Sequence, residues 1–338
     1  MGTDDRKGRG NAMKRTIAFL LSLLFLCACG GTVPERANEP KSRGAQPAAE
    51  ARAPEAASAS ETDADTVALS SAAPAETPAP VPPEVRFPGK FSDTPVYGDK
   101  SYKSSTIDVS IRSVTVEDTY AKICTFHVAD IYVKDVTSIK AAAAYGDFNT
   151  RYSRKVKEIA DSVGALLAID GDSYVRVKKS FVIRNGVLYR DTLIEDTDLC
   201  VLYRDGRMET KQWGTFTMQE IIDADPWQVW GFGPALLDEN GHAIEITHSL
   251  SGHNPRAAIG YYEPGHYCFV VVDGRLDGWS EGIRLSTFSK LMEDLGCKAA
   301  YNLDGGGSAQ MYWNGEIISR SCNESRVISD IIYLLPEE

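Results

Sequence analysis

Acidic residues follow three apolar segments of the chain, directly where each segment ends. The segments and the residues after them are 165–169 with Asp170-Gly171-Asp172, 267–272 with Asp273-Gly274-Arg275, and 299–303 with Asp304-Gly305. Loops at the ends of buried strands often converge on one site. Carboxyl groups brought together there would repel each other, which raises the pKa of one of them. A neutral acid beside a carboxylate is what glycosidic hydrolysis requires, so Asp304, Asp273 and Asp172 are candidate catalytic residues.

The glycine triplet Gly305, Gly306, Gly307, followed by Ser308, is more than a turn needs. Each Asp-Gly pair alone is a common turn, but three successive glycines raise the entropic cost of folding. Consecutive glycines let the backbone approach a ligand closely or direct several N–H groups at one anion. No Gly-Lys-Ser/Thr follows, which excludes a nucleotide P-loop. We therefore predict that these four residues bind an anion, with an unspecialised turn as the alternative.

Two arginines and a glutamate complete the residues that could do this chemistry. Arg256 follows Pro255, which fixes the backbone, and its planar guanidinium suits a phosphate or a carboxylate. Arg326 is a second candidate of the same kind. A single arginine is more often part of a surface ion pair. Glu281 lies in a glycine-flanked loop and is either a fourth candidate acid or a solvated side chain.

Composition excludes several other functions. The formal net charge of −11 argues against nucleic acid as a partner. The five histidines form no ligand pair for zinc, and no Gly-x-Ser-x-Gly elbow is present. We expect no required cofactor, although an acidic cleft that binds phosphate could recruit Mg²⁺ or Ca²⁺. The domain cysteines allow one disulfide but match no disulfide framework, and Cys268 is expected in the core.

Hydrophobic periodicity predicts an α+β fold with a large, mostly antiparallel or mixed sheet. Strands are expected at 106–117, 122–134, 165–169, 267–272, 299–303 and 327–335, with hairpins around Asn185-Gly186, Asp205-Gly206 and Asn314-Gly315. Helices are expected at 154–163, ended by Gly164, at 216–224, and at 287–295 with Ser286 as the N-cap.

The N-terminal part of the chain reads as an export signal followed by a spacer. Basic residues precede the apolar run 17–26, which is too short to span a bilayer. Residues 1–29 end in a lipobox-like Leu-Cys-Ala-Cys, so Cys29 is the expected lipidation site and simple secretion the alternative. Residues 30–94 are rich in Ala, Pro, Glu and Ser and are expected to be disordered. Residues 95–338 would then form one domain on the outer face of the membrane.

In their order along the chain, these motifs resemble the phosphodiester glycosidase domain family, whose members include bacterial proteins. The resemblance covers about residues 140–335 and rests on Asn302-Leu303-Asp304-Gly305-Gly306-Gly307-Ser308, Asn254-Pro255-Arg256, Val272-Asp273-Gly274-Arg275, Ala168-Ile169-Asp170-Gly171-Asp172 and Arg326. Asp170 stands where that family usually carries asparagine.

The resemblance implies hydrolysis of a sugar 1-phosphodiester, such as an N-acetylglucosamine 1-phosphodiester, at the anomeric carbon. Phosphate would then be bound by Arg256, Asn254, Arg326, Asp170 and the glycine loop, with Asp304 as the first-choice carboxylate. Two alternatives remain at this level. One is a non-catalytic envelope module that binds phosphate-containing glycans, and the other is a structural cell-surface protein.

Overall fold

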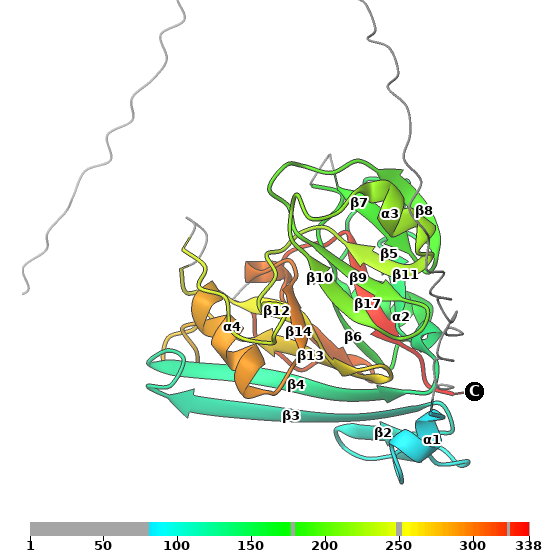
Figure 1. Cartoon of the computed structure of the whole chain (residues 1–338). Helices are drawn as coiled ribbons and strands as arrows, with labels where there is room; N and C mark the ends of the chain where they lie inside the picture. The colour runs from blue at the N-terminus through cyan, green and yellow to red at the C-terminus, as the bar shows by residue number, and fades with distance from the viewer. Residues whose placement is uncertain (1–80, 177–179, 248–251, 323–324, 338) are drawn as a thin grey trace, which may run out of the picture. The chain divides into compact units, whose positions relative to one another are not determined.

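The computed structural model describes residues 81–176, 180–247, 252–322 and 325–337. These residues form three sheets, in which every strand pair is antiparallel, and four α-helices (Figure 1). The predicted sheet-rich α+β fold is thereby confirmed. The predicted export signal, the predicted lipidation site Cys29 and most of the predicted spacer lie outside the described residues. In the part that the structure describes, no helix is long and apolar enough to cross a membrane.

The largest sheet has seven strands in the order β1-β2-β3-β4-β13-β12-β14. Its strands are β1 Val96–Tyr97, β2 Ser101–Lys103, β3 Ile107–Glu117, β4 Ile123–Val133, β13 His266–Val272, β12 Arg256–Glu263 and β14 Ala299–Asn302. The long β3–β4 hairpin pairs without interruption from Ile107 opposite Val133 to Glu117 opposite Ile123. The period-2 alternation of apolar and polar residues in both segments predicted these two strands.

Two five-stranded sheets complete the fold, in the orders β10-β9-β11-β7-β8 and β16-β15-β6-β17-β5. Their strands are β10 Met208–Lys211, β9 Leu199–Tyr203, β11 Pro226–Trp230, β7 Phe181–Arg184, β8 Val187–Asp191, β16 Glu316–Ile317, β15 Met311–Trp313, β6 Leu167–Asp170, β17 Asp330–Leu334 and β5 Lys140–Ala143. The helices are α1 Pro83–Arg86, α2 Val156–Val163, α3 Met218–Asp223 and α4 Leu285–Asp294.

The main core is shared by all three sheets. Buried side chains from each sheet, including Ile259, Leu202 and Leu167, pack into one apolar cluster. Helix α4 packs against β12 and β13 in a second cluster, to which it contributes Phe288 and Met292. A third cluster joins α2 to the β6–β17 pair. Each strand that ends near a candidate acid is therefore anchored in a packed core.

The antiparallel order of β13, β12 and β14 brings the candidate loops to one edge of the large sheet. Arg256, at the start of β12, is opposite Val272 at the end of β13. Ala258 is opposite Asn302, at the end of β14. The end of β6 joins this edge because the Asp304 N–H donates to the Gly171 carbonyl at 3.1 Å. Topology thus places Asp273, Arg256 and Asp304 close together.

Several local predictions are confirmed by backbone geometry. Gly164 closes α2 with φ of 66°. The hairpins β7–β8 and β15–β16 turn through Asn-Gly pairs in which both residues have positive φ, as a type I′ turn requires. At Asp205-Gly206 only the glycine has positive φ, so that hairpin has a longer turn than predicted. Cys268 is buried as expected, and its Sγ lies 3.7 Å from that of Cys297 without a bond between them.

Several predicted boundaries differ from the structure by a few residues, including the starts of α2 and α3. Helix α4 begins after Arg284, not at the expected Ser286 cap, because Leu285 is buried in the core and packing outweighs the capping preference. The closing strand β17 begins at Asp330, later than the predicted residue 327. Phe87 is buried and its ring lies 5.1 Å from that of Tyr132, so the folded unit begins before residue 95.

Candidate active site

The glycine turn after β14 is packed closely against residues of β12 and β13. A side chain on Gly305 would have its Cβ 3.0 Å from the Pro255 carbonyl oxygen. A Cβ on Gly306, whose φ is +63°, would lie 3.3 Å from a guanidinium nitrogen of Arg275. The glycines are therefore needed for close approach and for positive φ, and they bring the turn directly against arginine side chains.

The N–H groups of this turn are largely used within the protein. The Gly305 N–H donates to Asp304 Oδ1 at 2.9 Å, and the Gly306 N–H donates to the Pro255 carbonyl at 2.9 Å. The Ser308 N–H donates to the Gly305 carbonyl at 3.3 Å, inside the short 3₁₀ turn Gly306–Ser308. Three of the four backbone donors of the expected cradle are therefore used within the protein in this structure. Of these four groups, only the Gly307 N–H has no partner among the described residues.

Arg256 and Arg275 supply the positive charge at this turn. Arg256 is largely buried, and its Nη2 donates to the Gly252 carbonyl at 2.9 Å. Burial, followed by the charge of Arg275, lowers the pKa of Arg256 to about 10. Arg275 has a positive φ of 59°, and its Nη2 donates to Asn254 Oδ1 at 2.6 Å. Two adjacent guanidinium groups that repel each other favour an anion between or beside them.

Arg326 joins the segment before β17 to the glycine turn. Its Nη2 donates to Asp304 Oδ1 and to the Gly305 carbonyl, each at 2.8 Å, and its Nε donates to Ser308 Oγ at 2.8 Å. Asp304 is 7% exposed. The structure therefore places Asp304 and Ser308 in one hydrogen-bonded unit with Arg326.

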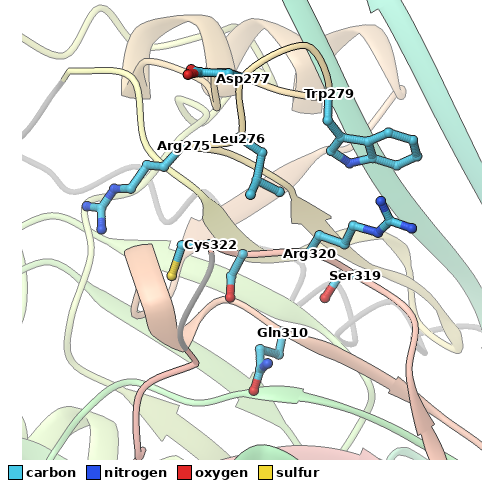
Figure 2. Close-up of a pocket in the computed structure, with 9 residues that line it drawn as sticks. Arg275, Leu276, Asp277, Trp279, Gln310, Ser319, Arg320 and Cys322 are labelled. Carbon is cyan, nitrogen blue, oxygen red and sulfur yellow. The ribbon is translucent and has the colours of Figure 1, made fainter.

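A cavity of about 680 Å³ lies beside this cluster (Figure 2). Its walls are Arg275, Leu276, Asp277, Trp279, Gln310 and the segment 319–322. The Arg320 guanidinium carbon lies 4.4 Å from the centre of the Trp279 ring. Figure 2 shows this stacked pair at one side of the cavity and Arg275 at the other. An aromatic face with neighbouring polar groups is suited to a sugar ring.

Asp273 builds the wall of this cavity and does not face into it. Its carboxylate is fully buried and accepts from the Arg320 N–H at 2.6 Å, from Trp279 Nε1 at 2.8 Å and from His127 Nε2 at 3.2 Å. All of these donors come from the protein. In this structure Asp273 positions Trp279 and Arg320, and its assignment as a catalytic acid stays a prediction.

Asp172 is also removed from the cleft. It is fully buried, its Oδ1 lies 2.7 Å from Arg184 Nη2, and its Oδ2 accepts from the Gly231 N–H at 2.9 Å. Arg184 also pairs with Asp330 Oδ2 at 3.1 Å. The candidate Asp172 is therefore part of a buried triad in which Arg184 lies between two carboxyl groups.

Asp170 and Glu281 have separate environments. Asp170 is fully buried, and its Oδ1 accepts from the Gln310 N–H at 3.1 Å. Burial and the nearby charge of Asp304 raise the pKa of Asp170 well above its usual value. Asp170 is thus enclosed in this structure, where it fixes Gln310 in the cavity wall, and its contact with phosphate stays a prediction. Glu281 is not part of the cavity, and its carboxylate lies 3.5 Å from His253 Nδ1.

Sequence reasoning missed Arg275, Arg320, Trp279 and Gln310. Arg275 was within a motif that we singled out, but its positive φ could not be read from residue type. Trp279 lies in the glycine-flanked loop that was considered for Glu281, and Arg320 and Gln310 lie in segments that carry no motif. Among the described residues, no group of three His, Cys, Asp or Glu side chains is arranged to hold a metal ion.

Comparison with known proteins agrees with this architecture. The profile of the phosphodiester glycosidase family matches residues 163–335. A stretch of 164 residues, 46% of this chain, is 29% identical to an uncharacterized SPbeta prophage-derived protein of Bacillus subtilis (strain 168). The match spans only 25% of that relative.

A solved structure shares the fold. It is the catalytic domain of zebrafish N-acetylglucosamine-1-phosphodiester alpha-N-acetylglucosaminidase, auto-inhibited by its pro-peptide. The TM-score is 0.56 at 20% identity, over 72% of this chain and 88% of that domain. The residues that match the family make up about half of the sequence and include the glycine turn, Arg256 and Arg326. The chain belongs to the phosphodiester glycosidase family.

Proposed function

We infer that this chain is a hydrolase that cleaves a sugar 1-phosphodiester at the anomeric carbon. One observation carries the proposal: Arg256 and Arg275 lie against the glycine turn that begins at Asp304, beside a cavity with an aromatic wall. The family points to a glycosidase-type hydrolase. The zebrafish enzyme with the same fold is named for an N-acetylglucosamine 1-phosphodiester, which makes this class the first to test.

The guanidinium groups would bind the phosphodiester and stabilise the charge that it gains on leaving. A donor that acts mainly in the transition state contributes about 3 kcal/mol, or about a hundredfold in rate. A phosphate leaves readily without full protonation, so a single carboxylate is enough. Asp304 is our choice for that carboxylate. It would attack the anomeric carbon or activate a water molecule, while Arg326 holds it in position.

The sugar would occupy the cavity beside Trp279. Its ring face would lie on the indole, and Gln310 and Ser319 would bind its hydroxyl or acetamido groups. Asp170 and Asp273 would act through these side chains as positioning residues, since both are fully buried.

The direct test is an assay of the purified chain with methyl N-acetylglucosamine 1-phosphodiester, with and without a chelator. Release of free N-acetylglucosamine supports the proposal. Saturable binding without any turnover would favour the alternative, a non-catalytic module that binds phosphate-containing glycans. In that case Asp304→Asn would leave the affinity unchanged.

The same assay with a chelator tests whether the reaction requires a divalent cation. We propose that Arg256 and Arg275 meet the phosphate charge, so that EDTA leaves the rate unchanged. A rate that is lost on chelation and restored by Mg²⁺ or Ca²⁺ would show that a cation is required.

We further propose that the chain is exported and anchored by a lipid on Cys29. This rests on the basic and apolar residues before that cysteine. Metabolic labelling with a radioactive fatty acid should mark the wild-type protein and not Cys29→Ser. Equal labelling of both would contradict the anchor, and release of unlabelled wild-type protein into the medium would favour secretion.

A further inference from the structure

Two exposed tyrosines have no role in the proposed reaction. Tyr145 and Tyr152 are each 61% exposed, the highest exposure of any aromatic side chain in the described ranges. Their rings meet edge to face, with centroids 5.4 Å apart. The Arg154 guanidinium carbon lies 5.0 Å from the centre of the Tyr145 ring. We call Tyr145, Tyr152 and Arg154 the tyrosine patch. Exposed aromatic groups arranged in this way commonly mark a binding surface.

The tyrosine patch is attached to the chain segment that carries Arg326. Arg154 and Ile328 exchange two backbone hydrogen bonds, of 3.0 and 2.8 Å. The Lys155 ammonium donates to the Ser325 carbonyl. Two residues before Ile328, Arg326 binds Asp304 and the glycine turn. One short segment therefore contacts the patch on one side and the candidate catalytic carboxylate on the other.

The surface around the patch is basic, although the chain as a whole has a net charge of −11. Residues 145–161 contain the bases Arg151, Arg154, Lys155 and Lys157 and the acids Asp147, Glu158 and Asp161, and Lys157 pairs with Asp161 at 2.9 Å. Arg154 is partly paired with Glu158 at 3.5 Å. Nearby Arg176 is exposed and donates to the Val327 carbonyl at 3.2 Å. The patch thus combines aromatic faces with an excess of positive charge.

We propose that the tyrosine patch binds further repeats of an anionic glycan in which sugars alternate with phosphodiesters. Sugar rings would stack on the tyrosines, and the phosphates between them would contact the arginines and lysines. A small phosphodiester would fill the cavity without reaching the patch. The inference rests on the proposed function for its substrate class, and it adds that the natural substrate is a polymer.

The test compares a polymer with a small substrate on the whole chain. The probes are purified poly(N-acetylglucosamine 1-phosphate) and methyl N-acetylglucosamine 1-phosphodiester. The double variant Tyr145→Ala/Tyr152→Ala is expected to raise the KM for the polymer about tenfold, from the loss of two stacking contacts. Its kcat/KM for the small substrate should stay within about twofold of wild type, because the patch does not contact the reacting bond. Trp213→Ala, which removes another exposed aromatic side chain, is the matched control.

Affinity electrophoresis in gels that contain the polymer separates this inference from the proposed function. If no substrate is hydrolysed but the tyrosine variant has lost retardation by the polymer, the inference stands and the hydrolase proposal fails. If the polymer is cleaved and bound equally by wild type and variant, the inference is overturned. Equal loss of activity on both substrates would also overturn it. Phosphate-free chitooligosaccharides should not compete, and competition as strong as that of the polymer would contradict the role of charge.

Discussion

Arg256 and Arg275 hold two positive charges against the same glycine turn. Burial and the charge of Arg275 lower the pKa of Arg256 to about 10, and a bound anion would favour its charged form. Arg275 also adopts a positive φ of 59°, which residues other than glycine rarely do. Strained backbone and repelling charges at one place are typical of a binding site. Arg256 and Arg275 at the glycine turn are therefore the main structural support for phosphate recognition.

Replacement of Arg275 tests that relationship. Arg275→Ala is expected to lower kcat/KM for a sugar 1-phosphodiester by about 10² to 10³, because a charged donor to the leaving phosphate is removed. Steady-state kinetics measure the change. Arg204→Ala is the control, since Arg204 makes an exposed ion pair with Asp225. A loss below about threefold in folded Arg275→Ala would remove this residue from the site.

Asp304→Asn should be more damaging than any arginine replacement. It keeps the shape of the side chain but removes the charge that attacks or activates water, so we expect a loss of about a thousandfold or more in kcat. The melting temperature should fall only modestly, because the charge that pairs with Arg326 is lost while the shape of the side chain is kept. Asp225→Asn is the matched control at an exposed ion pair. Near-normal turnover by correctly folded Asp304→Asn would remove our assignment.

Asp273→Asn should behave as the loss of a positioning residue. The amide cannot accept from Arg320, Trp279 and His127 as the carboxylate does, so the aromatic wall of the cavity should loosen. We expect KM to rise about tenfold with a smaller change in kcat. A fall in kcat as large as that of Asp304→Asn, with KM unchanged, would instead identify Asp273 as a catalytic acid.

The buried Asp330 makes stability depend on pH. Burial raises its pKa to about 7, with a further contribution from Asp172 and an opposing one from Arg184. Between about pH 4 and pH 7 the folded state therefore binds more protons than the unfolded state, so this group's contribution to stability falls as pH rises. Urea unfolding across that range should show a fall for wild type that is reduced in Asp330→Asn. An identical pH dependence for both proteins would contradict the shifted pKa.

Much of the fold could be predicted because local signals agree with the tertiary structure. The β3–β4 alternation, the Asn-Gly hairpins and Gly164 all follow from residue type and spacing. Helix α4 shows where this fails. The Ser286 cap is a good local signal, but burial of Leu285 starts the helix earlier. Packing energies of this kind are not visible in a local sequence pattern.

The candidate site likewise contains some residues that the sequence predicted and others whose roles it could not separate. Asp304, Gly305, Arg256 and Arg326 were predicted and come together at one sheet edge. Asp172 and Asp273 looked equivalent to Asp304 in sequence, since all three follow apolar strands. Their roles separate only through partners distant in the chain, Arg184 for Asp172 and Arg320 for Asp273. Burial and long-range hydrogen bonds therefore decide which carboxylate can meet a substrate.

The most direct test of the proposed reaction is to identify the bond that breaks. The purified chain would hydrolyse methyl N-acetylglucosamine 1-phosphodiester in H₂¹⁸O, and both products would be analysed by mass spectrometry within the first few turnovers. Attack at the anomeric carbon predicts ¹⁸O in the hydroxyl group of the released N-acetylglucosamine and none in methyl phosphate. Attack at phosphorus would instead place ¹⁸O in the phosphate group of methyl phosphate or of N-acetylglucosamine 1-phosphate and leave the sugar hydroxyl groups unlabelled. That result would contradict the proposed glycosidase mechanism.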